Sequence, residues 1–234
     1  MELTALTLIN VQTLLISISV VALSILNFCF VGHALLTFAA YFPARSYVWQ
    51  NPGQPWTPPT GREHRVQLGY DYSPENMILV STAFSILAGL FGIAGFWIAK
   101  NSPKLSTLWS ASTLSASTAA FVASFVSIIV SSVKYEKLAH STCSWSAGRY
   151  TNSRLTCTRE LVACELVNFI TDTNWADNRR ACRETKGARV TLVPLTVLTF
   201  VLVVLYALRI HMLRTVKSVD ESAEERVERL QGEE

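Results

Sequence analysis

The residues of this chain best suited to chemistry are five cysteines, four of which lie in one segment. Cys143, Cys157, Cys164 and Cys182 are close in sequence, whereas Cys29 stands in the first apolar run. Four cysteines confined to one segment favour two disulfides, which form in an oxidising compartment. Zinc or unpaired thiols are the alternatives, but the gaps of 13, 6 and 17 residues contain no Cys-x-x-Cys pair. We therefore expect disulfides, with no metal and no cofactor.

The local pattern restricts how these cysteines pair. Residues 157–170 (CTRELVACELVNFI) have the spacing of an amphipathic helix, with Leu161, Cys164 and Asn168 on one face. In a helix Cys157 and Cys164 are two turns apart, about 10 Å, and the Cα atoms of a disulfide lie within about 7 Å. Two connectivities stay open: Cys143–Cys157 with Cys164–Cys182, or Cys143–Cys164 with Cys157–Cys182.

His33 is the one ionisable side chain inside an apolar run. A buried ionisable group in a membrane span is a functional candidate by default. Without a carboxylate or cysteine at the same depth, His33 is a weak signal for a haem, metal or proton site, and a structural role is the simpler interpretation. Glu160 and Glu165 alternate with arginines and are interpreted as solvated helix faces. Because phosphate-binding, nucleophile-elbow and His-Glu-x-x-His motifs are absent from the sequence, the pattern leans against an enzyme.

The elements that position these residues follow from the distribution of charge. Four stretches, roughly 3–44, 76–99, 105–133 and 190–208, contain no Lys, Arg, Asp or Glu. A bilayer core of about 30 Å needs about 20 apolar residues of helix, and continuous apolar runs favour helices over a barrel. The first run lacks a basic start and is too long for a signal peptide, so we interpret it as a span.

The sequence therefore predicts an all-α fold class: a polytopic membrane protein whose four-transmembrane-helix bundle carries a disulfide-stapled helical second outer loop. The single membrane domain, 1–234, has predicted spans at about 7–41, 75–99, 105–133 and 190–213, outer loops 42–74 and 134–189, and a cytoplasmic tail 214–234. The acidic tail either extends the fourth helix or is a solvated charged end.

The cysteines and the basic residues indicate opposite orientations. Ten of the 20 basic residues lie in 134–189, which by the positive-inside rule would put this loop in the cytosol. Disulfides would put the same loop outside. We follow the cysteines and expect a multi-pass protein of the plasma membrane or the secretory pathway, with both termini in the cytoplasm. The net charge of +3 is too small to indicate nucleic acid.

Small residues recur at helix-packing intervals in the second span. They are Ser81, Ser85, Gly89, Gly92 and Gly95. In lipid, small side chains let helices approach closely. The third span is rich in serine, so we expect the second and third spans to form a tight hairpin, with a polar pore along the serine face as the alternative.

Four spans, cytoplasmic termini, a short first outer loop and a larger cysteine-bearing second outer loop resemble the tetraspan plan, as in tetraspanins. The resemblance covers the whole chain as topology. The Cys-Cys-Gly motif of tetraspanins is absent, and Thr142-Cys143-Ser144 is the nearest segment. Claudin-like and fungal Sur7/PalI-like proteins share the plan, but their loop signature belongs to the first outer loop, where this chain has no cysteine. The resemblance implies an architecture and no particular activity.

These observations together favour a non-enzymatic membrane organiser or accessory subunit that recognises partners through the cysteine-containing outer loop. Its expected partners are the lipid bilayer and either other membrane proteins or further copies of itself. One alternative is a small-solute channel or transporter that acts as an oligomer through the serine-rich third span. The other is a membrane-bound accessory enzyme of a biosynthetic pathway.

Overall fold

The computed structural model is mostly helical and describes residues 2–48, 65–101, 103–140, 144–146, 153–166 and 175–231. Its long helices are α1 (Glu2–Tyr41), α2 (Ser73–Asn101), α3 (Pro103–His140) and α5 (Trp175–Gln231). Each contains a segment that is long and apolar enough to cross a membrane: Thr7–Tyr41, Ser73–Ile98, Thr107–Glu136 and Arg179–Thr215. The prediction of four helices of this length and composition is confirmed.

Local sequence explains where α2 and α3 begin. Pro74 and Pro103 stand in the first turn of these helices, where a backbone N–H has no partner within the helix. Immediately before α2, Oδ1 of Asp71 accepts hydrogen bonds from the backbone N–H of Ser73 (3.0 Å) and from its hydroxyl (2.8 Å). This turn fixes the entry of the chain into α2, and the negative charge of Asp71 suits the N-terminal end of a helix.

Two helices differ in length from the predicted elements, one within the second loop and one after it. Helix α5 begins at Trp175, well before the predicted span at 190, because charged residues end a hydropathy run without ending a helix. Arg180 and Glu184 are one turn apart on α5 and pair at 3.0 Å, a spacing that stabilises helices. The predicted helix over 157–170 is too long, since α4 covers Arg159–Cys164 and Cys157 ends a strand. Residues 167–170 lie outside the described part of the chain.

The chain divides into two compact units, and the long helices contribute to both. The first unit comprises Met1–Ser24, Ala83–Val122 and Leu195–Glu234. The second comprises Ile25–Thr82 and Ala123–Pro194 and contains the elements between the long helices.

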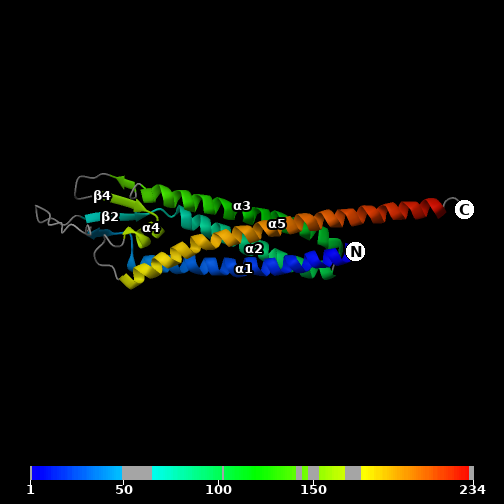
Figure 1. Cartoon of the computed structure of the whole chain (residues 1–234), viewed down its shortest axis with the longest axis horizontal. Coiled ribbons are helices and arrows are strands. Elements are labelled where there is room, and N and C mark those ends of the chain that lie inside the picture. The colour runs from blue at the N-terminus through cyan, green and yellow to red at the C-terminus, as the bar shows by residue number, and fades with distance from the viewer. Residues whose placement is uncertain are drawn as a thin grey trace, which may run out of the picture. The chain divides into compact units, whose positions relative to one another are not determined.

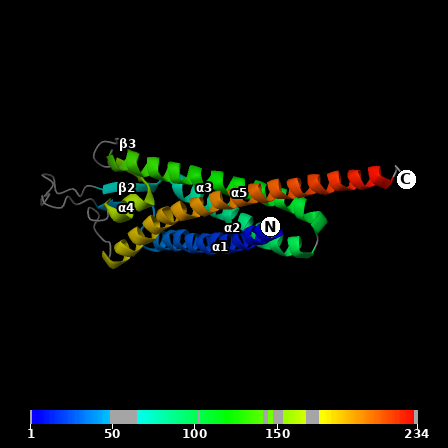
Figure 2. The same ribbon diagram turned by 45° about the vertical axis from the view of Figure 1, so that its right-hand side comes forward.

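Among the described residues, the second unit contains a four-stranded sheet that the sequence analysis did not predict. Its order is β1 (Ser46–Val48), β2 (Arg65–Tyr70), β4 (Ser153–Cys157) and β3 (Ser144–Ser146). The outer pairs are antiparallel, whereas β2 and β4 are parallel. Figure 1 shows β2 and β4 side by side near α4, and the turned view in Figure 2 keeps β2 next to α4. The parallel pair joins the segment before α2 to the segment after α3.

The first unit has close helix approaches at small residues. A Cβ added to Gly92 of α2 would lie 2.1 Å from Oγ and 2.9 Å from Cβ of Ser17 on α1. A Cβ added to Gly89 would lie 2.6 Å from Cγ2 of Val21, again on α1. These close approaches leave no room for a larger side chain between α1 and α2 at either glycine.

Helix α3 turns hydroxyl groups toward the interior of the first unit. Ser110, Thr113 and Ser117 are fully buried. The hydroxyl of Thr113 donates to the carbonyl of Trp109 (2.8 Å), and that of Ser117 donates to the carbonyl of Thr113 (2.7 Å). The same helix therefore supplies an acceptor for each of these two hydroxyls. Gly95 of α2 faces Trp109, so the glycines of α2 contact α3 as well as α1.

Candidate functional site

Strands β1, β2, β3 and β4 and helix α4 form a layer that we call the cap. Period-2 alternation along β2 and β4 points Val66, Leu68 and Leu155 toward one buried face. The apolar core of the second unit unites this face with α4 and with residues of α1 and α5: Phe38, Phe42, Tyr47, Val66, Leu68, Leu155, Cys157, Leu161, Val162, Ala163, Leu166 and Ala181. Because one cluster includes residues from both loops and from α1 and α5, the cap shares its packed interior with these two long helices.

Helix α4 is short, and its position is fixed by its neighbours in sequence. Thr158 is its N-cap, and the Thr158 side chain accepts a hydrogen bond from the backbone N–H of Leu161 (3.4 Å). Leu161 and Val162 are buried in the core. A six-residue helix has too little internal hydrogen bonding to be stable alone, so packing and covalent attachment hold α4 in place.

The covalent attachment is a disulfide between Cys164 at the end of α4 and Cys182 on α5, with Sγ atoms 2.06 Å apart and Cα atoms 4.9 Å apart. Cys157 is also disulfide-bonded, and Cys29 is a free, exposed thiol. Of the two predicted connectivities, the one that contains Cys164–Cys182 agrees with the structure. Its other half pairs Cys157 with Cys143, which lies outside the described residues, and stays a prediction.

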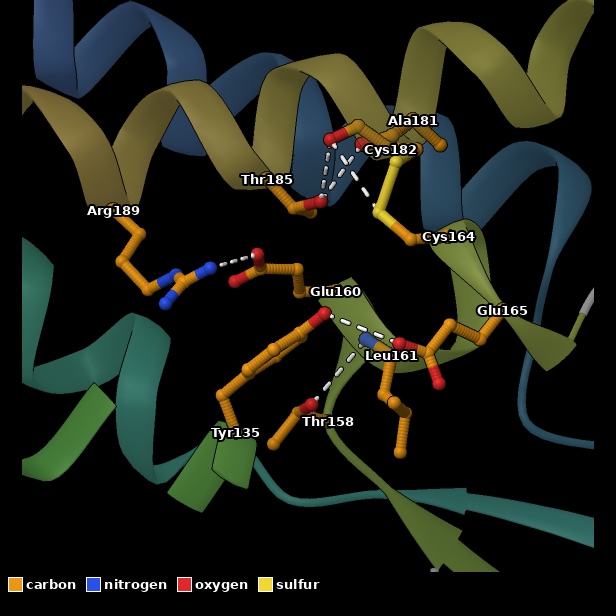
Figure 3. A network of polar contacts seen from close by, with 10 residues as sticks. All are labelled: Tyr135, Thr158, Glu160, Leu161, Cys164, Glu165, Ala181, Cys182, Thr185 and Arg189. Carbon is orange, nitrogen blue, oxygen red and sulfur yellow. Dashed lines mark hydrogen bonds and ion pairs between the residues drawn. A yellow bond between two sulfur atoms is a disulfide. The ribbon is translucent and has the colours of Figure 1, made fainter. Parts of the chain in front are cut away.

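Polar contacts also join α4 to α3 and α5 (Figure 3). Nη2 of Arg189 on α5 donates to Oε1 of Glu160 on α4 (2.8 Å). The hydroxyl of Tyr135 on α3 donates to Oε1 of Glu165 (3.2 Å), and the guanidinium of Arg189 lies 4.4 Å from the centre of the Tyr135 ring. The side chain of Glu160 is only 12% exposed, so its interpretation as a solvated group is wrong. Glu165 is exposed, as expected.

Arg159 is the most enclosed charged residue of α4. Its guanidinium faces three aromatic rings, with distances to the ring centres of 5.8 Å for Phe38, 5.4 Å for Tyr70 and 4.6 Å for Tyr72. The carboxylate of Glu75 lies 3.7 Å from Nη1, beyond hydrogen-bonding distance. Cation–π attraction and one long ion pair therefore compensate the buried charge of Arg159.

A cavity of about 30 Å³ lies inside the second unit, between the cap and the helices. Helices α1, α2, α3, α4 and α5 all contribute to its wall. Ala34, Ile78 and Ala188 supply apolar wall, while Arg159 and Glu75 supply charged groups. The wall of this small cavity therefore combines a mostly apolar surface with a few buried polar groups.

The cap and the turn that joins β2 to α2 contain three groups with shifted pKa values. Burial alone would raise the pKa of Asp71, but hydrogen bonds from Nζ of Lys134 (2.9 Å) and from Ser73 outweigh it and lower the pKa below its ordinary value. Burial raises the pKa of Tyr70, whose hydroxyl donates to the carbonyl of Phe42 (2.7 Å). Burial also raises the pKa of Tyr47, against a smaller opposing effect of Arg45. These groups hold the cap to the ends of α1, α2 and α3.

His33 lies on α1 within a polar cluster that includes α5. Nη2 of Arg180 lies 2.8 Å from Nε2 of His33, and Nδ1 of His33 lies 2.9 Å from Oε1 of Glu184. Arginine can only donate, so Nε2 accepts, and Nδ1 carries the proton donated to Glu184. Thr37 donates to the second oxygen of the same carboxylate (3.3 Å). The expectation that His33 has no carboxylate at the same depth is therefore wrong, because Glu184 of α5 is its partner, and the His33 side chain is 48% exposed.

Arg159 and Glu75 were not predicted from the sequence. The structure places them in the second unit, which also contains Cys157, Cys164 and Cys182. Glu75 stands directly before the charge-free run 76–99. A charged residue at the edge of a predicted span was the one signal in the sequence that could have pointed to it. The predicted helix-packing residues are divided between the two units, with Ser81 in the second and Ser85 in the first. Ser81 and Ser85 are buried, and Gly89, Gly92 and Gly95 belong to the first unit.

Among the described residues, no group of three or more His, Cys, Asp or Glu side chains could hold a metal ion. Fold and site define a class: a mainly helical chain with four helices able to span a membrane and a disulfide-linked cap. No protein-family model matches the chain, and no curated protein or solved structure is detectably similar to it.

Proposed function

We propose that the chain is a multi-pass integral membrane protein on the tetraspan plan, with both termini in the cytoplasm and the cap outside. The four long apolar helices support insertion. The Cys164–Cys182 disulfide supports an oxidising compartment for the cap, as in the secretory pathway or at the plasma membrane. An even number of spans returns both ends of the chain to the same side.

Within this arrangement, we propose that the protein is a non-enzymatic organiser or accessory subunit that recognises partner proteins through the cap. One observation carries the proposal: segments from two separate loops share one sheet, and a disulfide fixes the adjoining α4 to α5. A surface held in one conformation before binding loses little entropy when a partner docks. The exposed apolar faces of the spans remain available for lipid or for helices of other membrane proteins.

Sidedness is tested by labelling intact cells with a membrane-impermeant maleimide, with and without reductant. The Cys29→Ser variant removes the free thiol and its background. We expect labelling of the loop cysteines only after reduction. Labelling that requires permeabilisation and no reductant would invert the orientation and contradict the proposal.

Partner recognition is tested with the Cys164→Ser/Cys182→Ser variant, which removes the covalent link between α4 and α5. Cys29→Ser is the matched control, because it replaces a cysteine that makes no disulfide. Co-purified proteins are quantified by mass spectrometry, and resistance to alkaline extraction reports insertion. We expect the cap variant to stay inserted and to lose partners that the control keeps. An unchanged set of partners at unchanged abundance would show that the anchored cap is not the recognition surface.

A further inference from the structure

The cavity in the second unit contains more hydrogen-bonding capacity than its own residues use. Arg159 is 8% exposed, and its Nε and Nη1 atoms have no hydrogen-bond partner. The same holds for Nε of Arg189, for the hydroxyl of Ser131 and for Oε2 of Glu75. All four residues contribute to the wall of the cavity. Unpartnered buried polar atoms are unfavourable unless a bound group completes them.

The types of the unpartnered atoms indicate what such a group must offer. The guanidinium nitrogens of Arg159 and Arg189 can only donate, and the hydroxyl of Ser131 can donate as well. Only Oε2 of Glu75 must accept. Donors therefore predominate, and a matching ligand presents an acceptor oxygen toward Arg159.

The charges around the cavity indicate that this ligand is neutral at its polar group. Two arginines, Arg159 and Arg189, and two glutamates, Glu75 and Glu160, contribute to the wall, so the formal charges cancel. A phosphate or carboxylate would add a charge with no counterpart in a largely apolar enclosure, which is costly. A carbonyl oxygen accepts hydrogen bonds from arginine without adding charge.

The size and the lining of the cavity fit the polar end of a longer molecule. A volume of about 30 Å³ has room for about two water-sized groups. Ala34, Ile78 and Ala188 give the apolar wall. These three residues belong to α1, α2 and α5, and each lies within a segment able to cross a membrane. An acyl chain that leaves the cavity would therefore continue along helices suited to contact lipid.

We propose that this cavity binds the ester carbonyl of an acyl lipid, with the guanidinium of Arg159 donating to the carbonyl oxygen and the first methylenes lying against Ala34, Ile78 and Ala188. The inference depends on the membrane insertion proposed above and is independent of partner recognition by the cap. It predicts a lipid that purifies with the chain and is selected by its linkage more than by its headgroup.

The test uses the full chain in detergent micelles and compares two phosphatidylcholines of equal chain length, one with ester and one with ether linkages. The ether lipid keeps the headgroup and the tails but lacks the carbonyl. Binding is measured by native mass spectrometry. Hydrogen bonds to a charged donor favour the ester lipid by about tenfold in affinity. Equal affinities would overturn the proposal. A free fatty acid that binds more tightly than the ester lipid would also overturn it, because it would identify an anion site.

A pair of variants locates the effect. Ala34→Leu fills the cavity, whereas Ala39→Leu makes the same change at an exposed position on α1. We expect Ala39→Leu to keep the preference for the ester lipid and Ala34→Leu to lose it. A preference that persists in well-folded Ala34→Leu would place the carbonyl elsewhere and refute the site. If Ala34→Leu does not fold, the comparison of the ester and ether lipids on the unaltered chain still tests the proposal. Resistance of the unaltered chain to alkaline extraction tests membrane insertion separately.

Discussion

Replacing Gly92 with alanine tests the close approach of α1 and α2 in the first unit. The new Cβ would lie 2.1 Å from Oγ and 2.9 Å from Cβ of Ser17. The hydroxyl could rotate away by giving up its 2.7 Å hydrogen bond to the carbonyl of Thr13, which costs about 1 kcal/mol. The Ser17 Cβ cannot move without α1, and forcing extra volume into a packed interior typically costs about 1–3 kcal/mol.

The matched control is Gly32→Ala, the same change at a helical glycine of α1 where an added Cβ meets nothing within 4 Å. Alanine gains up to about 1 kcal/mol of helix propensity over glycine in both variants, so the difference between them isolates the clash. We expect Gly92→Ala to be less stable than Gly32→Ala by about 1–3 kcal/mol.

The assay is unfolding of the purified chain in mild detergent by added dodecyl sulfate, followed by circular dichroism to give the free energy of unfolding. The double variant Ser17→Gly/Gly92→Ala moves the small residue to the opposite helix and should recover most of the loss, as in a double-mutant cycle. Equal stabilities of Gly92→Ala and Gly32→Ala would refute the argument that α1 and α2 leave no room for a side chain there.

Three further predictions concern the cap. Loss of the disulfide in Cys164→Ser/Cys182→Ser, whose partners are 18 residues apart, should cost the cap about 3 kcal/mol, and a reductant should remove the difference from the unaltered chain in thermal unfolding. The pKa of Asp71 is lowered in the folded chain, so its carboxylate contributes stability at any pH above the ordinary pKa of 3.8, and this stability is lost as the pH falls through the lower folded value. Acid should therefore destabilise the cap. Asp71→Asn should weaken this pH dependence in unfolding curves recorded from pH 6 to pH 2. The pKa of Tyr70 is raised in the folded chain, so its neutral hydroxyl contributes stability that is fully present below the ordinary pKa of 10.0 and is lost at higher pH. Absorbance titration should find one tyrosine that ionises only when the chain unfolds in alkali. That tyrosine should be missing in Tyr70→Phe.

The sequence predicts the long helices well because an absence of charge over many residues is a local signal. The same criterion misses residues 175–189, which are helical although they carry several charges. Arg180 and Arg189 are tolerated there because Glu184 and Glu160 pair with them, and the second pair involves another element. A hydropathy run cannot register such a partner.

The sheet was not predicted because its signal is short and its pairing is non-local. Val66, Leu68 and Tyr70 alternate along β2, but three alternating residues are common in loops. These residues form a strand because they pair in parallel with β4, which follows α2 and α3 in the sequence. The surroundings of Arg159 are non-local in the same way, because its guanidinium on α4 faces the rings of Tyr70 and Tyr72 from the other loop. The disulfide between Cys164 and Cys182 was easier to predict, because the number of cysteines and their confinement to one loop are visible in the sequence alone.

The parallel pairing of β2 with β4 has a consequence for the order of events during synthesis. Val66 lies opposite Ser153, so the ribosome must add the whole α2–α3 region before the edge of β2 that faces away from β1 can pair with β4. At roughly 5–20 residues per second, this interval is on the order of 4–17 s. During that time β2 exposes unsatisfied backbone groups, which are a template for wrong pairing with other chains. Nascent chains that stall between α3 and β4 should therefore be the species that chaperones and degradation machinery engage most strongly.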